Sequence, residues 1–331
     1  MQVNEKFIGV DVSKETLDIA IAATRAHLRI ANNAAGFKQL QAWLKQLGVS
    51  IRECWFVLEY TGGYEYRLVQ FFQSKGIRFS CIPGLEIKKS AGMQRGKNDR
   101  IDAQRIALYG YEKRDRLHPH KVCSASVTRL RQLLTQRSSF VKIRKSQEHR
   151  LKELTSMMDL KPGDELVKNY RQSIAFAEKM IVKTESCIKE LVAKDAAMER
   201  NFKLITSIPG IGNINGWMTI AYTDNFERFV DARKYGAYCG VVPYEHQSGK
   251  SIKGKSRISH MANKSVKAEL SMAAKASVQH DPEMRAYYNR RIALGKHHMS
   301  VMNEVRFKLI LRMFAVVNKQ QPYVKNLGIA A

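Results

Sequence analysis

The order of apolar segments in the first third of the chain constrains its fold most strongly. Short segments rich in β-branched residues come first and predict a hairpin extended by a third strand, and helix-like and strand-like segments then alternate. In chain order we expect three strands, a helix, a strand, a helix, a strand and a helix, at 6–13, 16–23, 27–32, 36–48, 53–63, 65–76, 77–83 and 97–107. This alternation indicates an α/β domain whose sheet is covered by helices.

The same order of elements is that of ribonuclease H-like and RuvC-like domains, in which the first and fourth strands are neighbours. Asp11 ends the first strand and Glu59 ends the fourth, so we expect these two carboxylates to lie close together. Asp99 and Asp102 are three residues apart on the last predicted helix and therefore share one of its faces. A helix also accepts acidic residues in its first turn because of its dipole, and that simpler interpretation stays open for this pair.

The middle third has a different pattern, with long, highly charged helical segments. One helix is expected from Ala125 to Met158 and a second from Asp164 to about Arg200, with "LKPGD" between them. Apolar residues from Tyr170 to Met198 recur in alternating steps of four and three, which is typical of a coiled-coil arm. Two helices packed in an ordinary bundle are the alternative.

The last third is predicted to be mainly helical and to contain a helix–hairpin–helix at "SIPGIG". Gly210 and Gly212 allow a tight turn whose amides, at the start of the next helix, can face a phosphate. The stretch from Gln247 to Ala268 carries six basic residues and no acid, and we expect a mobile, phosphate-binding loop followed by a helix from about Asn263. Its candidate nucleic-acid-binding residues are Lys250, Lys253, Lys255, Arg257 and Lys264.

The charge balance indicates a polyanionic partner. The chain has 331 residues, 56 Lys+Arg against 30 Asp+Glu, and a net charge of +26. A nucleic acid is the usual partner of such a chain, and we expect double-stranded DNA; an anionic membrane surface is the competitor, but no transmembrane run, lipidation motif or signal peptide is found. Five cysteines without metal-binding spacing suggest reduced, buried thiols and a cytoplasmic, nucleoid-associated protein of prokaryotic type.

Four carboxylates from compatible elements suit divalent cations. Asp11, Glu59, Asp99 and Asp102 offer the oxygen ligands that Mg²⁺ prefers, with Mn²⁺ as a substitute. Two such ions about 3.5–4 Å apart can activate a nucleophile and stabilise the leaving oxygen of a phosphodiester. The ions also remove the repulsion between neighbouring carboxylates.

The ordered set of motifs resembles the IS-one-ten (IS110) family of transposases, which includes the Piv and MooV recombinases. The motifs are "GVDVSK", "LEYTGGY", "KNDRIDAQRIA", "SIPGIG" and "HQSGKSIKGKSRISHMANK", and they span Lys6 to about Phe314. The resemblance implies a RuvC-like catalytic site made by Asp11, Glu59, Asp99 and Asp102. Tyr60 departs from the pattern, since the family commonly has a small residue after the glutamate.

The resemblance implies three further properties. Ser248, in "HQSGK", matches the serine that becomes covalently linked to DNA, although Ser251, Ser256 and Ser259 compete for that role on the sequence alone. A structured guide RNA encoded by the element supplies sequence specificity, and the protein acts as a homo-oligomer, a dimer or tetramer. The changes of pattern along the chain predict three domains: a RuvC-like catalytic domain at 1–122, a coiled-coil helical arm at 123–200, and a C-terminal transposase domain with the helix–hairpin–helix and the serine loop at 201–331.

Two other functions are compatible with parts of the pattern. A Holliday-junction resolvase or another RuvC-like nuclease would need the four acids but neither the C-terminal serine nor the long arm. A non-catalytic, architectural nucleic-acid-binding protein would need the charge but has no reason to gather four acids. Covalent trapping of the protein on DNA separates the three.

Overall fold

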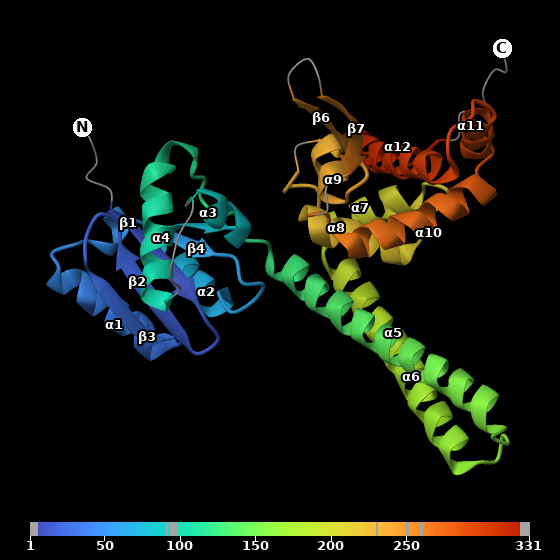
Figure 1. The fold of residues 1–331 in the computed structure, drawn as a ribbon, viewed down its shortest axis with the longest axis horizontal. Helices are drawn as coiled ribbons and strands as arrows, with labels where there is room; N and C mark the ends of the chain where they lie inside the picture. Colours follow the sequence, from blue (N-terminus) through green and yellow to red (C-terminus); the bar gives the residue numbers. More distant parts are fainter. Residues whose placement is uncertain are drawn as a thin grey trace. The chain divides into compact units, whose positions relative to one another are not determined.

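The computed structural model describes residues 6–90, 92, 98–229, 231–248, 252–258 and 261–324, with the backbone alone at 245–248 and 252–257. The chain divides into two compact units, Met1–Val122 and Cys123–Ala331. The first is a mixed α/β unit and the second is mostly helical (Figure 1). The arm helices belong to the same compact unit as the C-terminal part, and the division into three functional domains stays a prediction.

The first unit contains a five-stranded sheet. Its elements are β1 (Lys6–Val12), β2 (Thr16–Ile21), β3 (His27–Ala31), α1 (Ala34–Gln46), η1 (Ile51–Glu53), β4 (Cys54–Glu59), α2 (Tyr66–Lys75), β5 (Arg78–Ile82), α3 (Gly84–Ser90), α4 (Asp99–Glu112) and η2 (Arg114–Arg116). The strand order is β3-β2-β1-β4-β5. The first three strands are antiparallel, whereas β1, β4 and β5 run parallel. The predicted order of elements is confirmed, and so is the pairing of the first and fourth strands; the short helix α3 was not predicted.

Both faces of this sheet are covered. Residues of β1 alternate between the faces, so that Ile8 and Val10 join a core with α1 and α2 while Phe7 joins a second core with α3 and α4. The helix α4 lies across the sheet on the second face (Figure 1). The residues that share the face of Phe7 are therefore the ones that meet α4.

The second unit begins with a helical hairpin. Its helices are α5 (Ala125–Met158), α6 (Glu165–Lys194), α7 (Ala196–Thr206), α8 (Asn213–Thr223), α9 (Ala232–Tyr238), α10 (Lys264–His280), α11 (Pro282–Ala293) and α12 (His298–Lys319), with the strands β6 (Pro243–Ser248) and β7 (Ile252–Ile258). The long helices α5 and α6 pack side by side (Figure 1). The apolar seam of α6 faces inward, with Ala177, Ile181 and Ile188 buried.

The predicted extension of the second arm helix to about Arg200 is wrong. The chain leaves the helix at Asp195, whose backbone is extended, and the Asp195 side chain accepts a hydrogen bond from the Met198 amide to start α7. A side chain that caps a new helix favours a break at its own position. Met198 consequently belongs to α7 and to the core of the unit rather than to the seam of α6.

The ends of the arm helices are part of the C-terminal core. Leu130 of α5 and Ile188 of α6 are fully buried in one cluster with Trp217 of α8 and Tyr235 of α9. The inner faces of α10 and α12 also pack into this core. The shared core explains why the arm and the C-terminal helices form one compact unit.

The predicted mobile loop after Gln247 is wrong in part, because this stretch contains a β-hairpin. The strands β6 and β7 are antiparallel, with Ser248 opposite Ile252. The helix expected from about Asn263 is confirmed, since the Asn263 side chain caps α10 by accepting from the Val266 amide. Alternating side chains in "SIKGKSRI" are compatible with a strand, and the density of Gly, Ser and Lys hid that signal.

The cysteines can be compared with the expectation of reduced, buried thiols. All five cysteines are free thiols, but Cys187 on α6 is exposed, so the expectation of buried thiols is wrong for that residue. Its position on the outer face of the arm explains the exposure.

Within the described ranges, none of the helices has the length and apolar character needed to cross a membrane.

Candidate active site

Asp11 and Glu59 lie at the same edge of the sheet. Val10 of β1 is opposite Leu58 of β4 in a parallel ladder, so Asp11 and Glu59 are the next residues on the two neighbouring strands. Strand alternation directs both side chains to the face that carries Phe7, which is the face covered by α4. Parallel strands that end together thus set the two carboxylates beside each other.

A glycine on β1 determines how closely α4 approaches. A Cβ atom at Gly9 would stand 2.2 Å from both the carbonyl oxygen of Ala103 and the amide nitrogen of Ala107. No other residue type has room at this position, since real Cβ atoms do not approach backbone so closely. A Cβ atom at Gly110, later in α4, would stand 3.6 Å from the Phe7 ring, so the turn of α4 that precedes Ala103 lies towards the Asp11 end of the strand.

That first turn of α4 carries the second pair of acids. Asn98 caps the helix by accepting a hydrogen bond from the Arg100 amide, and Asp99 and Asp102 follow within the turn. Each acid has a cationic neighbour: Arg105 Nη1 lies 2.8 Å from Asp102 Oδ1, and Arg29 Nη2 lies 3.7 Å from Asp99 Oδ2. The helix-dipole interpretation therefore holds alongside the metal-ligand hypothesis.

The other three predicted carboxylates are within electrostatic reach of Asp11. The pKa of Asp11 is raised from 3.8 to about 6, first by burial and then by the charges of Asp102, Glu59, Asp99 and Asp18, in that order. In the part of the chain that the structure describes, no three His, Cys, Asp or Glu side chains lie close enough together to hold a metal ion. The carboxylates thus lie near Asp11 but do not form a group of metal ligands in this structure. Their assignments as catalytic and metal-binding residues stay predictions.

The Glu59 carboxylate lies directly over the start of α3. A Cβ atom at Gly84 would stand 2.0 Å from Glu59 Oε1, so a glycine is required there for the carboxylate to keep its place. Gly84 follows Pro83 after β5, and β5 pairs with β4 up to Glu59 and Ile82. Gly84 was not among the predicted site residues, and the "PG" at the end of a predicted strand was the only signal for it.

A fifth carboxylate, Asp18, was missed as a member of this site. It lies directly opposite Asp11 in the β1–β2 ladder and is only 4% exposed. His27 Nε2 is 2.8 Å from Asp18 Oδ1, and Arg29 Nε is 3.6 Å from Asp18 Oδ2. Arg29 consequently lies between Asp18 and Asp99. An acid inside the apolar run "TLDIAI" was the signal, because a buried charge requires a partner.

The predicted second centre lies on the β6–β7 hairpin of the other unit. Ser248 is the last residue of β6, and Lys253, Lys255 and Arg257 follow in β7, where the backbone alone is described. Lys250 and the rival serines Ser251 and Ser259 lie outside the described residues, whereas Ser256 belongs to β7. The nucleophile and these DNA contacts remain predictions.

The glycines of the predicted helix–hairpin–helix have different environments. Gly210 has a positive φ of 92° and packs against α10, where a Cβ would stand 2.7 Å from the Ala273 carbonyl oxygen. Gly212 is exposed at the start of α8, with open space around it. Lys264 is exposed in the first turn of α10. A packing role thus explains Gly210, while Gly212 and Lys264 are accessible for the predicted phosphate contacts.

Comparisons with known proteins identify the class of this chain. Residues 8–158 match the model of the DEDD transposases of IS110 type, and residues 202–289 match that of the IS116/IS110/IS902 transposase family. The chain is 26% identical to the pilin gene-inverting proteins of Moraxella bovis and Moraxella lacunata, over 98% of this chain and 99% of each relative. It is also 28% identical over 114 residues to an uncharacterised protein of insertion element IS110 from Streptomyces coelicolor, covering 34% of this chain and 28% of that protein.

The matched family model and the two pilin gene-inverting relatives place the protein among DNA recombinases, enzymes that transfer phosphoryl groups. Two family models that together span most of the chain make the assignment specific. The chain belongs to the IS110-type family of transposases.

Proposed function

We propose that this chain cuts and rejoins DNA as the recombinase of an insertion sequence, using a RuvC-like site formed by Asp11, Glu59, Asp99 and Asp102. The observation that carries the proposal is the environment of Asp11, whose pKa is raised to about 6 by burial and by the other acids around it. A partly buried group of like charges is unfavourable in a metal-free protein and becomes favourable around a cation. The family assignment supports DNA as the substrate.

The donor atoms fit magnesium or manganese. Asp11, Glu59, Asp99 and Asp102 would hold the ions, since carboxylate oxygens are the ligands that hard divalent cations prefer. Bound Mg²⁺ or Mn²⁺ supplies Lewis-acid stabilisation of charge on the phosphate oxygens. The protein's part is to keep Asp11 and Glu59 rigid on neighbouring strands and to bring Asp99 and Asp102 over them on α4. Asp18 and Arg29 position the site, since Arg29 reaches both Asp18 and Asp99.

The second half of the proposed chemistry is a covalent step at Ser248. Its hydroxyl oxygen attacks a DNA phosphorus atom, the new bond being Ser248 Oγ–P, while the bond from phosphorus to the leaving sugar oxygen breaks. The serine proton is lost to solvent or to a carboxylate, and the leaving oxygen takes up a proton. The family resemblance supports this role, and so does the position of Ser248 at the end of a strand followed by basic residues.

Sequence specificity and assembly complete the proposal. The family resemblance favours an element-encoded RNA that pairs with DNA, so that pairing supplies specificity while the protein supplies shape and chemistry. Joining two DNA segments requires at least two protomers, and we propose a dimer or tetramer that works at the nucleoid. The relatives named as pilin gene-inverting proteins support recombination as the outcome.

Covalent trapping tests the proposal. Wild-type protein is incubated with element-end DNA, the guide RNA and Mg²⁺, and denaturing electrophoresis detects protein that remains attached to DNA. Asp11→Asn and Ser248→Ala should abolish the adduct, whereas Asp115→Asn, which changes an exposed acid of η2, and Ser256→Ala should keep it. Nicked DNA without an adduct would identify a resolvase-type nuclease. Binding without cleavage would identify an architectural protein.

A further inference from the structure

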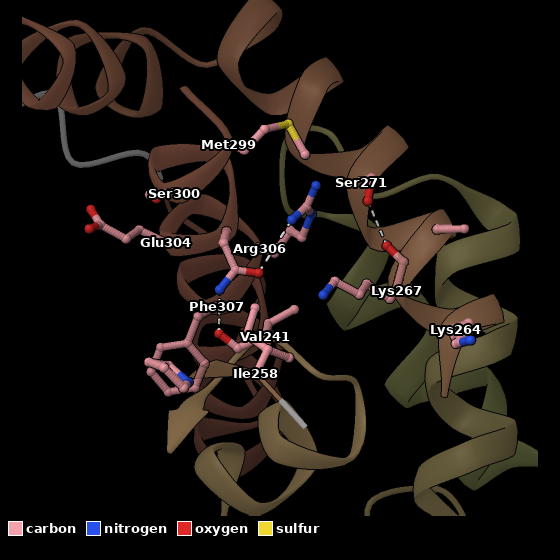
Figure 2. Close-up of a pocket in the computed structure, with 13 residues that line it drawn as sticks. Val241, Ile258, Lys264, Lys267, Ser271, Met299, Ser300, Glu304, Arg306 and Phe307 are labelled. Atoms are coloured by element: carbon pink, nitrogen blue, oxygen red, sulfur yellow. Dashed lines mark hydrogen bonds between the residues drawn. The ribbon is translucent and has the colours of Figure 1, made fainter. Parts of the chain in front are cut away.

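A cavity in the second unit is lined by a buried arginine, Arg306, for which no ion pair with a described acid is found. It has a volume of about 780 Å³ and lies between α10, α12 and the base of the β6–β7 hairpin (Figure 2). Lys264, Lys267 and Ser271 of α10 form one wall, and Asn303 and Arg306 of α12 form the other. Figure 2 shows Arg306 and Lys267 directed into the same space from the two helices.

Arg306 is the most informative residue of this cavity. Its side chain is 6% exposed, and its Nε atom has no hydrogen-bond partner among the described residues. Its Nη1 donates to Asn303 Oδ1 over 3.3 Å, and Asn303 is itself fixed because its Nδ2 donates to the Val241 carbonyl oxygen over 2.6 Å. The guanidinium is therefore held in one orientation while part of its hydrogen-bonding capacity is unused.

Lys267 adds a second cation to the cavity. Burial and the nearby Arg306 guanidinium lower the pKa of Lys267, and burial lowers the pKa of Arg306. Two like charges in a partly desolvated space are unfavourable unless an anion joins them. The repulsion between Lys267 and Arg306 therefore destabilises the free protein locally, and a bound anion would remove that repulsion.

The one acid in the lining is already neutralised. Glu304 accepts hydrogen bonds from Arg291, Lys296 and Tyr287, and these bonds hold the pKa of its carboxyl at about 2. Figure 2 shows Glu304 pointing away from Arg306. Glu304 consequently does not serve as the counter-ion for the Arg306 and Lys267 pair.

We infer that this cavity binds a phosphodiester group of a nucleic-acid strand, held by Arg306 and Lys267, with the adjoining sugar or base against Met299 and Phe307. The planar guanidinium presents adjacent N–H donors that match two phosphate oxygens. The apolar lining residues provide contact area for the nucleoside. This inference depends on the proposed function only in taking a nucleic acid, rather than a small phosphate compound, as the ligand.

The cavity is separate from the position of the proposed nucleophile. Pro243 lines it, whereas Ser248 ends the same strand five residues later, roughly 16 Å away along an extended backbone. The phosphate in the cavity is thus not the one attacked by Ser248. The bound phosphate instead fixes the path of a nucleic-acid strand beside the β6–β7 hairpin.

The test measures binding without cleavage. Fluorescently labelled single-stranded DNA and RNA oligonucleotides of one sequence are titrated with protein in EDTA at several salt concentrations. Arg306→Met and Lys267→Gln should each weaken binding about tenfold and lower the salt slope by about 0.7, the value for one phosphate on a single strand. Lys275→Gln, at an exposed lysine on α10, is the matched control and should leave both quantities unchanged.

Thermal unfolding separates a binding role from a structural one. Removing an unpaired buried charge should leave the melting temperature of free Arg306→Met unchanged or higher, while the oligonucleotide stabilises this variant less than wild type. Unchanged affinity in both variants would overturn the inference, as would a lower melting temperature for Arg306→Met together with normal binding by Lys267→Gln. Stabilisation by inorganic phosphate but by neither oligonucleotide would overturn the assignment to a nucleic acid. The absence of metal keeps this result independent of whether the proposed cleavage chemistry is correct.

Discussion

The carbonyl oxygen of Ala103 on α4 occupies the place that a side chain at Gly9 on β1 would need, with 2.2 Å between the oxygen and an ideal Cβ. This contact sets the height of α4 above the sheet and hence the height of Asp99 and Asp102 above Asp11. The carboxylate site depends on a residue that has no side chain and no charge. A search for chemical groups alone would overlook it.

Gly9→Ala should therefore lift α4 away from β1. Overpacking of this kind costs about 1–3 kcal/mol of unfolding free energy, and it should also weaken Mg²⁺ binding because the two pairs of acids separate. Urea unfolding measures the first effect, and calorimetric titration with Mg²⁺ measures the second. Gly163→Ala is the control, because a Cβ there meets nothing within 4 Å and its φ is not positive. Normal stability and metal binding in Gly9→Ala would contradict the packing argument.

Asp11→Asn should stabilise the metal-free protein at neutral pH and lose that advantage in acid. The pKa of Asp11 is raised from 3.8 to about 6, so above pH 6 the folded protein holds a charge that the unfolded chain carries at less cost. The cost is absent below about pH 4, where both states are protonated, and it grows through pH 6. After a discount for the partial exposure of Asp11, the gain at pH 7.5 should be about 1–2 kcal/mol.

Unfolding of both proteins in EDTA from pH 4 to 8 provides the check. The difference between Asp11→Asn and wild type should rise from about pH 4 to about pH 6 and level off above that. In saturating Mg²⁺ the order should reverse, because wild type gains binding energy that the variant lacks. A difference that is constant with pH would show that Asp11 does not titrate in this environment.

Asp18→Asn should be more destabilising than Asp99→Asn. Asp18 is 4% exposed and pairs with His27 and Arg29, so the change leaves buried groups without their charged partner and should cost about 1–3 kcal/mol. The Asp99 side chain is 60% exposed, and its loss should cost about 0.5 kcal/mol or less. Chemical denaturation measures both values. Equal costs would mean that Asp18 is not the anchor of Arg29.

The arm should contribute to assembly. Phe176 and Val182 on α6 are 61% and 67% exposed in the single chain, on the outer side of the α5–α6 pair. Phe176→Ser together with Val182→Ser should lower the solution mass of the complex with DNA and RNA, since apolar groups of this size favour burial against another subunit. Light scattering measures the mass, and Lys179→Ser on the same helix is the control. An active wild-type monomer would refute the prediction.

The sequence predicted the order of elements because apolar periodicity follows directly from burial on two faces of a sheet. It also placed Asp11 and Glu59 on neighbouring strands, since a strand order determines which ends meet. It missed Asp18 because one acid within an apolar run can be either a partnered buried charge or an exposed edge residue, and only the His27 and Arg29 contacts distinguish these. It missed Arg306 because an arginine on a helix reveals nothing about the space opposite it.

The final prediction concerns how the carboxylates and Ser248 cooperate. The predicted carboxylate ligands include no nucleophile, and the stretch from Gln247 to Ala268, which contains Ser248, carries six basic residues and no acid. Each half therefore needs what the other provides, and the two halves lie in different compact units. If the halves meet between protomers, a mixture of Asp11→Asn and Ser248→Ala chains should recover part of the cleavage and covalent adduct, because some sites then receive both intact halves. Each variant alone should be inactive. A mixture that stays inactive while labelled subunits demonstrably exchange would favour a site assembled within one chain, and normal adduct formation by Ser248→Ala alone would disprove the assignment of the nucleophile.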